Sequence, residues 1–161
     1  MAVRILLVED DAAIARIFVR ALVAAGHAVD HSADGAQGFA QLLAVAYDIV
    51  ISDVGIPKLD GLDLLELARR LRPDVSVIMM SGRLDPLAQA KAREMGALRY
   101  LLKPIGLLQL TRAVDTAAKL RAQRLGAMER RSAKQPKSGE FCFGEALDSG
   151  PGERVLTSKA G

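Results

Sequence analysis

Three carboxyl side chains stand directly after strand-like runs, where buried strands would end. Asp53 follows the run 49–52, and Glu9 and Asp10 follow the run 5–8. Acidic groups are expensive to bury unless they have partners. Three carboxylates at neighbouring strand ends would hold a hard divalent cation such as Mg²⁺, which prefers a few carboxylates and several retained waters. Because no His or Cys stands beside them, the set argues against zinc.

Two other predicted strands end in different groups. Ser81, which precedes a glycine, follows the run 75–80, and Lys103 follows the run 98–102. Carboxylates, a divalent cation, a hydroxyl and a lysine at one edge suit phosphoryl transfer, because cations neutralise the phosphoryl oxygens and a hydroxyl can donate to one of them. In this interpretation Asp53 is the nucleophile and forms an aspartyl phosphate.

Each of these residues also has a structural interpretation when it is considered alone. Asp10 or Asp11 could cap the following helix, and Asp53 could begin a turn. Ser81 could belong to an ordinary loop, and Lys103 could be a solvated lysine at a strand end. Their shared position at successive strand ends favours the chemical interpretation.

Three further polar residues are assigned structural roles. Asp60 and Gly61 form a turn and the start of a helix, and are not expected to be ligands. His27 and His31 lie around a polar strand and are both interpreted as structural.

Five apolar strand-like segments alternate with five helical patterns. The strands are predicted at about residues 3–8, 28–31, 48–52, 75–80 and 98–102. Gly26 ends the first helix, and Asp85 followed by Pro86 begins the fourth. The fourth helix presents mostly alanines, so its packing is expected to be weak. The fifth helix is predicted to continue to about Leu125.

This alternation predicts an α/β fold with a parallel sheet covered on both faces. Five such units favour a doubly wound, flavodoxin-like sheet with strand order 2-1-3-4-5. The second strand is the most polar and is placed at an edge. This order makes the first and third strands neighbours, and ligands of open α/β sheets bind at their carboxyl ends. Glu9, Asp10 and Asp53 fall at this position.

Composition indicates one domain with a tail in 161 residues. Hydrophobic residues make up 50% of the chain and aromatic residues 4%, so the core must be aliphatic. The single Cys142 excludes an intramolecular disulfide and fits a reducing compartment. No apolar run is long enough to span a bilayer, and no signal-peptide pattern is present. We therefore expect a cytoplasmic protein without a membrane partner.

The net charge of +3 is unevenly distributed. Residues 1–118 carry 13 Lys and Arg against 14 Asp and Glu, whereas residues 119–161 carry 9 against 5. Charge therefore gives no support for nucleic-acid binding by the main body, and no DNA binding is expected of this chain. The region 126–161 is predicted to be a basic tail or linker containing Gly, Ser and Pro, poorly ordered. The alternative is an interaction segment anchored by Phe141, Cys142 and Phe143.

These motifs resemble the receiver domain of two-component response regulators. The resemblance covers about residues 2–124 and is carried by the stretches 5–11, 53–61, 81–82 and 103–104. It implies a (βα)5 receiver domain at 1–125, followed by the tail at 126–161. Such a domain is a phosphoacceptor that assists its own phosphorylation and dephosphorylation, and is not classed as an enzyme.

The resemblance also implies a role for each site residue. Asp53 is the phosphoacceptor, and Glu9 and Asp10 hold Mg²⁺ directly or through water. The backbone carbonyl of Gly55 is expected to be a further metal ligand, beside the Asp53 carboxylate.

The remaining implied roles concern the switch. Ser81 moves toward the phosphoryl group, Lys103 pairs with it, and Tyr100 changes between an outward and an inward rotamer. The bond between Lys103 and Pro104 is expected to be cis.

The implied donor is a histidine kinase or a histidine phosphotransfer protein, and the output partner is unknown. Gly55 and Ile105 stand where larger side chains and Phe are frequent in relatives. The fifth strand lacks the acidic pair typical of relatives that dimerise through the surface of the fourth helix, fifth strand and fifth helix. A monomer or a weak phosphorylation-dependent dimer is therefore expected.

Three alternatives remain beside this interpretation. The chain could be the receiver part of a longer regulator whose output domain is missing. It could be a Mg²⁺-dependent phosphatase that forms an aspartyl phosphate, although those enzymes usually have an acid two residues after the nucleophile, where Gly55 stands. It could also be a pseudo-receiver that binds partners without phosphorylation, which the complete acidic, hydroxyl and lysine set disfavours.

Overall fold

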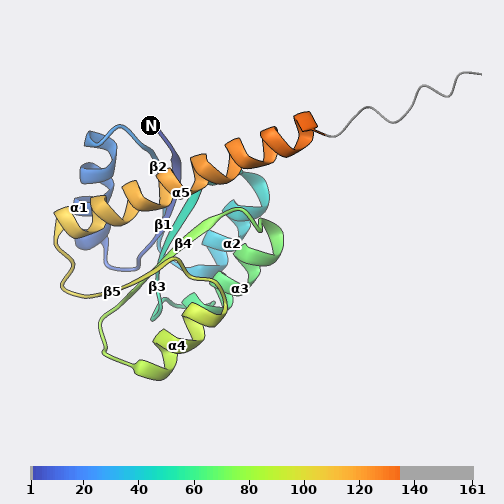
Figure 1. Cartoon of the computed structure of the whole chain (residues 1–161). Coiled ribbons are helices and arrows are strands. Elements are labelled where there is room, and N and C mark those ends of the chain that lie inside the picture. The colour runs from blue at the N-terminus through green and yellow to red at the C-terminus, as the bar shows by residue number, and fades with distance from the viewer. Residues whose placement is uncertain (1, 135–161) are drawn as a thin grey trace, which may run out of the picture.

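The computed structural model of the chain describes residues 2–134, so the predicted tail lies outside the described residues from residue 135 onward. Strands and helices alternate through this region (Figure 1). The strands are β1 Arg4–Val8, β2 Ala28–Ser32, β3 Ile49–Asp53, β4 Ser76–Ser81 and β5 Arg99–Leu102. The helices are α1 Ala12–Ala24, α2 Gly35–Ala44, α3 Gly61–Leu71, α4 Pro86–Glu94 and α5 Leu107–Lys134.

All strand pairs of the sheet are parallel, and the order is β2-β1-β3-β4-β5. The predicted α/β class and strand order are therefore confirmed, including the edge position of the polar strand β2. In the register of the central pairs, Ile5 lies opposite Ile49 and Asp53 lies opposite Met80. Asp53, at the end of β3, is thus level with the last residues of the neighbouring strands.

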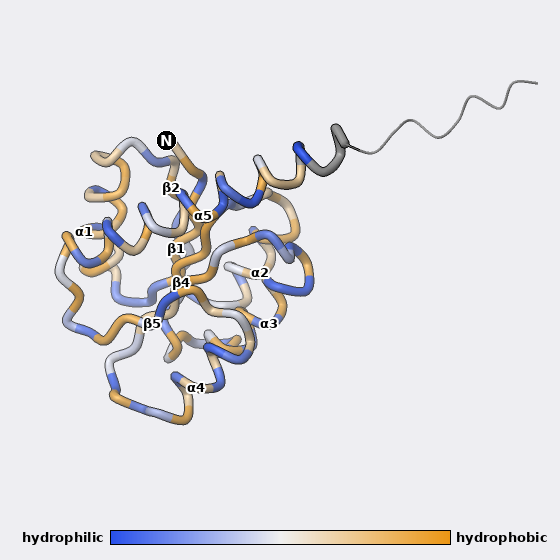
Figure 2. Tube along the Cα trace, viewed as in Figure 1, coloured by the Kyte–Doolittle hydropathy of each residue, from blue (hydrophilic) through white to orange (hydrophobic). Residues whose placement is uncertain are grey.

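Two apolar layers cover the sheet because successive strand side chains point to opposite faces. Leu7 and Ile51 pack with α1 and α5 on one face, whereas Leu6 and Val50 pack with α2, α3 and α4 on the other. The strands form the hydrophobic centre of the molecule (Figure 2). The core is aliphatic, as the composition predicted.

Acidic side chains begin the first four helices. Asp11, Asp34, Asp60 and Asp85 each accept a hydrogen bond from a backbone N–H of the following turn, which satisfies groups that a helix start leaves unpaired. The predicted caps at Asp11, Asp60 and Asp85 are confirmed. Gly26, with φ of +90°, ends α1 in a conformation that glycine adopts readily.

Helix α5 continues to Lys134, past the predicted end near Leu125. The extension is rich in strong helix formers, and the single Gly126 does not interrupt it. Arg121 anchors the helix to the sheet: Nε lies 2.8 Å from Asp48 Oδ1, and Nη1 lies 2.8 Å from Asp74 Oδ2. The last turns of α5 project beyond the sheet (Figure 1).

Helix α4 buries fewer residues than any other helix of the described chain. Ala92 is its only buried residue, and Leu87 is 83% exposed. The predicted weak packing of this alanine-rich helix is therefore confirmed.

Among residues 2–134 no helix has both the length and the apolarity needed to cross a bilayer.

A polar cluster joins β1, β2 and the loop before β3 at the amino-terminal edge of the sheet. Tyr47 donates a hydrogen bond to Asp30 Oδ2 at 2.8 Å, and Arg4 Nη2 lies 3.0 Å from the same oxygen. Burial, together with the hydrogen bond to Asp30, raises the pKa of Tyr47 to about 12.

The raised pKa of Tyr47 predicts a loss of stability in alkali. The folded state holds the phenol protonated up to about pH 12, whereas the unfolded chain ionises it from about pH 10. Its contribution, about 1–3 kcal/mol, is therefore complete below pH 10 and disappears as the pH rises toward 12. Chemical denaturation from pH 8.5 to 11.5 should show a steeper decline for the wild type than for Tyr47→Phe. Equal slopes would contradict this assignment.

Candidate functional site

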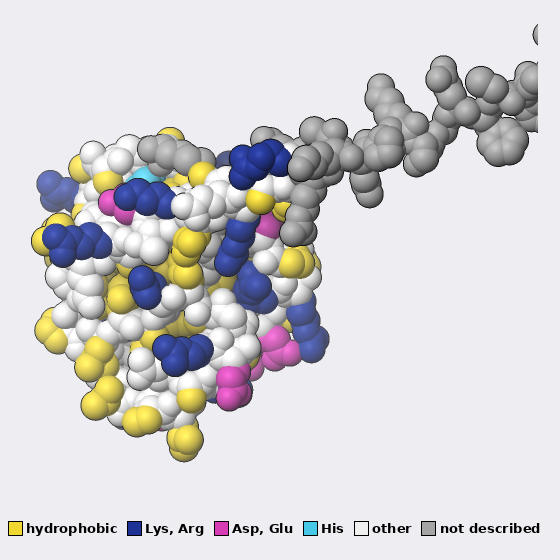
Figure 3. Space-filling view, viewed as in Figure 1, with side chains coloured by type: hydrophobic (Ala, Val, Ile, Leu, Met, Phe, Trp, Pro, Cys, Tyr) yellow, Lys and Arg dark blue, Asp and Glu magenta, His cyan; other side chains and the backbone are white. Residues whose placement is uncertain are grey.

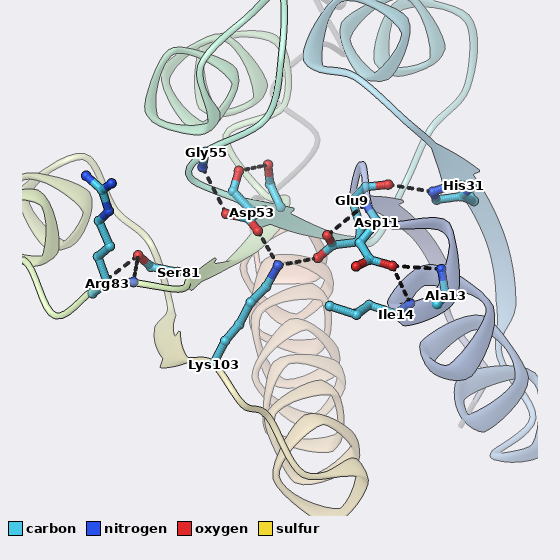
Figure 4. Close-up of polar contacts among 11 residues, drawn as sticks. Glu9, Asp11, Ala13, Ile14, His31, Asp53, Gly55, Ser81, Arg83 and Lys103 are labelled. Atoms are coloured by element: carbon cyan, nitrogen blue, oxygen red, sulfur yellow. Dashed lines mark hydrogen bonds and ion pairs between the residues drawn. The ribbon is translucent and has the colours of Figure 1, made fainter.

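The carboxyl ends of the central strands bring the predicted site residues together (Figure 4). Glu9 follows β1, Asp53 is the last residue of β3, Ser81 is the last residue of β4, and Lys103 follows β5. The parallel sheet places all four at one edge. The site therefore depends on the strand order and on where each strand ends.

Three carboxylates converge at this edge. Glu9, Asp10 and Asp53 each have an oxygen within 4.8 Å of the others. Glu9 is completely buried, Asp53 is 8% exposed, and Asp10 faces solvent. An oxygen-only donor set with one open side fits Mg²⁺, which keeps several of its waters. These three residues would hold the cation.

Lys103 places its amino group between the two buried carboxylates (Figure 4). Its Nζ lies 2.7 Å from Glu9 Oε2 and forms a second, short contact with Asp53 Oδ2. The bond between Lys103 and Pro104 is cis, as the family resemblance implied. The lysine therefore neutralises part of the negative charge that the strand ends collect.

The charges at the site influence one another. Burial raises the pKa of Glu9, and the hydrogen bonds from Lys103 and from the Asp11 amide offset only part of that effect. Burial alone would lower the pKa of Lys103, but its hydrogen bonds to Asp53 and Glu9 outweigh burial and raise the pKa. The lysine is thus held in its charged form.

Backbone contacts fix the position of Glu9. Its amide donates to Ser32 O at 3.0 Å, and its carbonyl accepts a hydrogen bond from His31 Nε2 at 2.8 Å. The Asp11 amide donates to Glu9 Oε1 at 3.2 Å. His31, which was assigned a structural role, therefore connects the edge strand to the acidic group.

Asp10 and Asp11 have separate positions, which the sequence alone left open. Asp11 Oδ1 accepts hydrogen bonds from the amides of Ala13 and Ile14, and therefore caps α1. Asp10 lies in the acidic cluster with Glu9.

The Ser81 hydroxyl is turned toward its own loop (Figure 4). It donates to Arg83 O at 2.9 Å and accepts from the Arg83 amide at 3.1 Å. A pocket of about 480 Å³ is lined by Asp53, Ser81 and Tyr100 among others. The Tyr100 hydroxyl is buried and has no hydrogen-bond partner among the described residues.

The loop after β3 also contacts the acidic group. The Gly55 amide donates to Asp53 Oδ1 at 2.9 Å, which fixes one oxygen of that carboxylate while Lys103 contacts the other. One oxygen of Asp53 is therefore bound by a backbone amide and the other by a lysine amino group.

Gly61 has a role in the site that the sequence analysis missed. A Cβ at this position would lie 2.1 Å from the backbone oxygen of Asp53, so α3 begins directly against the end of β3. The Asp60-Gly61 pair was interpreted as a turn, and nothing in a single sequence reports so close an approach. The absence of a side chain at Gly61 thus helps to position Asp53.

Comparisons with known proteins agree with this geometry. Residues 5–115 match the family described as the response regulator receiver domain. The chain is 39% identical over 119 residues to the transcriptional regulatory protein QseB of Haemophilus influenzae, covering 74% of this chain and 51% of that protein. It is 34% identical over 116 residues to the DNA-binding transcriptional regulator NtrC of Azospirillum brasilense, covering 72% of this chain and 24% of that protein. The chain thus spans about half or less of the length of these relatives.

Solved structures show the same fold. A response regulator receiver domain protein (CheY-like) from Methanospirillum hungatei aligns with a TM-score of 0.74 at 27% identity, covering 77% of this chain and 99% of that one. A receiver domain from Clostridium thermocellum aligns with a TM-score of 0.71 at 27% identity, covering 75% and 98%.

The close approach at Gly61 predicts a large effect of a single methyl group. Gly61→Ala should lower the free energy of unfolding by about 1–3 kcal/mol, because the helix start must move away from the strand end. Gly82→Ala is the matched control at the same edge, since a Cβ there meets nothing within 4 Å. Urea denaturation of both variants measures the difference. A Gly61→Ala protein as stable as Gly82→Ala would contradict the steric argument.

Proposed function

The chain belongs to the response regulator receiver domain family, and on that premise we propose that Asp53 accepts a phosphoryl group from the phosphohistidine of a kinase or phosphotransfer protein. A receiver domain is a phosphoacceptor module of two-component signalling rather than an enzyme. The observation that carries the proposal is the convergence of the Glu9, Asp10 and Asp53 carboxylates, two of which, Glu9 and Asp53, also contact the Lys103 amino group.

In the proposed reaction a carboxylate oxygen of Asp53 attacks the phosphorus of the donor. The new P–O bond forms in line with the P–N bond that breaks, and the electron pair of that bond stays on the imidazole nitrogen of the donor. Lys103 stabilises the phosphoryl oxygens, which it can reach from its contact with Asp53 Oδ2. The Gly55 amide holds Oδ1 throughout and orients the carboxylate.

Glu9, Asp10, Asp53 and the Gly55 carbonyl are the proposed holders of Mg²⁺. When bound there, the ion supplies positive charge opposite the phosphoryl oxygens. The chain's own contribution is to keep Glu9 buried and Asp10 exposed, so that the set is rigid on one side and open to water on the other.

Ser81 and Tyr100 are the proposed switch. To donate to a phosphoryl oxygen, the Ser81 hydroxyl must give up the hydrogen bond that it donates to Arg83 O. Tyr100 lines the same pocket and has no hydrogen bond to lose within the described chain. Because α4 buries little, a rearrangement of this side of the domain needs only a few kcal/mol between two states.

The proposed division of the chain separates a receiver from a tail. We place the receiver at residues 1–125 and treat 126–161 as a tail or linker, although α5 itself continues to Lys134. Two relatives of which this chain covers about half or less are named as transcriptional regulators. For this chain, a cytoplasmic setting and signalling by contact with a protein partner are the proposals that the receiver alone supports.

Replacing the acceptor should abolish phosphorylation. Asp53→Asn should take up no phosphate from acetyl phosphate with Mg²⁺, because an amide oxygen is a poor nucleophile. Asp60→Asn is the matched control, since Asp60 lines the same pocket but caps α3, a role that Asn also fills. Phosphate-affinity gel electrophoresis measures the incorporation. Undiminished labelling of Asp53→Asn would sink the assignment.

Removing the lysine should slow the same reaction. Lys103→Met retains the length of the side chain but loses its charge, and we expect incorporation to fall by a factor of roughly 10²–10³. Lys91→Met, on the exposed side of α4, should leave the rate unchanged. Initial rates at saturating Mg²⁺ test this, and equal rates for the two variants would remove Lys103 from the mechanism.

A further inference from the structure

The surface formed by α4, β5 and α5 combines positive charge with exposed apolar side chains; we call it the α4–β5–α5 face. Arg93, Arg99 and Arg112 are exposed there and form no ion pair with any residue that the structure describes. Leu108 is 64% exposed beside them. Lys and Arg side chains are spread over this face with hydrophobic ones between them, and Asp and Glu lie toward its margin (Figure 3).

A groove runs along the face between β5 and α5. It encloses about 500 Å³ and is lined by residues that include Arg99, Leu101, Leu108, Arg112 and Thr116. Its lining combines apolar side chains with two arginines, so the groove fits a segment that carries both apolar and acidic side chains.

A second copy of the chain is a poor occupant of this groove. A two-fold interface places the same patch on both sides, so a face that carries a net positive charge would meet an equally positive face. Asp115 and Glu94 are the exposed acids that α4, β5 and α5 offer along the described part of this face. Like charges at an interface oppose association.

The chain itself contains a segment of the required chemistry. Residues 140–148 read GEFCFGEALDSG with their flanking glycines and serine, and carry three acids, two phenylalanines and a leucine without any Lys or Arg. The preceding stretch 130–137 is basic. The receiver chemistry makes no use of this acidic and apolar segment.

We propose that residues 140–148 dock on the α4–β5–α5 face of the same molecule, antiparallel to α5. In an extended segment every second residue points to one side at a spacing of about 6.6–6.8 Å, and residues four apart on a helix rise about 6 Å. In one alignment of the segment with α5, an acidic residue faces an arginine and apolar residues face leucines. It places Phe141, Phe143, Glu145 and Leu147 against Leu120, Thr116, Arg112 and Leu108.

The connection is long enough for this register. Seven residues lead from Lys134 to Phe141 and span at most about 23–25 Å. The return along α5 from Lys134 to Leu120 is about 21 Å. A position one helical turn deeper, at Thr116, is about 27 Å from Lys134 and out of reach for Phe141, so the tether itself limits the register. Tethering also raises the effective concentration of the segment to about the millimolar range, at which weak contacts are populated.

Docking would give the segment a function. It would cover the groove that contains Arg99 and Arg112, and would exclude another acidic protein from it. Release would expose both arginines to a partner in trans. The segment would thus act as an internal competitor for the face.

The single cysteine makes the contact measurable in the full chain. Cys142 is the only thiol, and in an extended segment it points away from the side that carries Phe141 and Phe143. A nitroxide attached there should reduce the amide NMR signals of Leu108 and Arg112 at least two-fold. The signals of α2, on the opposite face of the sheet, should not change.

Charge variants separate docking from random approach. Arg99→Glu with Arg112→Glu should restore the lost signals, and adding Glu145→Lys, at the position that faces residue 112 in this register, should reduce them again. Arg16→Glu with Arg20→Glu on α1 is the matched control and should change nothing. Repeating the label at Ser149→Cys in a Cys142→Ser chain checks that the nitroxide does not create the contact.

Several outcomes would overturn the proposal. Equal signal loss on both faces of the sheet, no loss at low salt, or a loss that survives Arg99→Glu with Arg112→Glu would each do so. Signal loss in an unlabelled ¹⁵N chain mixed with a spin-labelled ¹⁴N chain would show that the occupant is a second copy. The measurement requires no phosphorylation, so its failure is distinct from a failure of phosphate uptake at Asp53.

Discussion

The ammonium group of Lys103 between two buried carboxylates is the interaction on which the site depends. Glu9 is completely buried and Asp53 nearly so, and buried charges are costly unless an opposite charge pairs with them. The fold therefore has to bring the end of β5 close to the ends of β1 and β3. In the order β2-β1-β3-β4-β5, β5 lies two places from β3 and three from β1, or about 10 and 14 Å at the usual strand spacing. The long side chain of Lys103 and the two carboxylate side chains together span this gap.

The two edges of the sheet have different roles: one carries ion pairs that stabilise the fold, and the other carries the acidic site. At the amino-terminal edge opposite charges are paired: Arg4 with Asp30, and Arg121 with Asp48 and Asp74. At the carboxyl-terminal edge three carboxylates face one lysine, and the balance of charge is incomplete. The first arrangement holds the edge strand and α5 in place. The second keeps an acidic group ready to accept a cation and a phosphoryl group.

Most of the fold could be predicted from apolar periodicity, because each strand and helix face must be buried. The order of the strands and the acidic group at their carboxyl ends followed from that reasoning. Three features of the structure could not be predicted in this way. The steric demand at Gly61 and the orientation of Ser81 toward Arg83 depend on atoms far from their own segment. The end of α5 was placed too early because polarity was weighted above helix propensity.

A signal that consists of added charge at one strand end must be transmitted by an element that moves at low cost. Helix α4 meets this condition, since Ala92 is its only buried residue. The same sparse packing leaves Leu87 in solvent and Arg93 without an ion pair in the described structure. The side of the domain that rearranges most easily is therefore also the side with free charge and apolar surface. A partner that binds this side of the domain can use both its charge and its apolar surface. If the partner binds one of the two conformational states more tightly than the other, it shifts their populations toward that state.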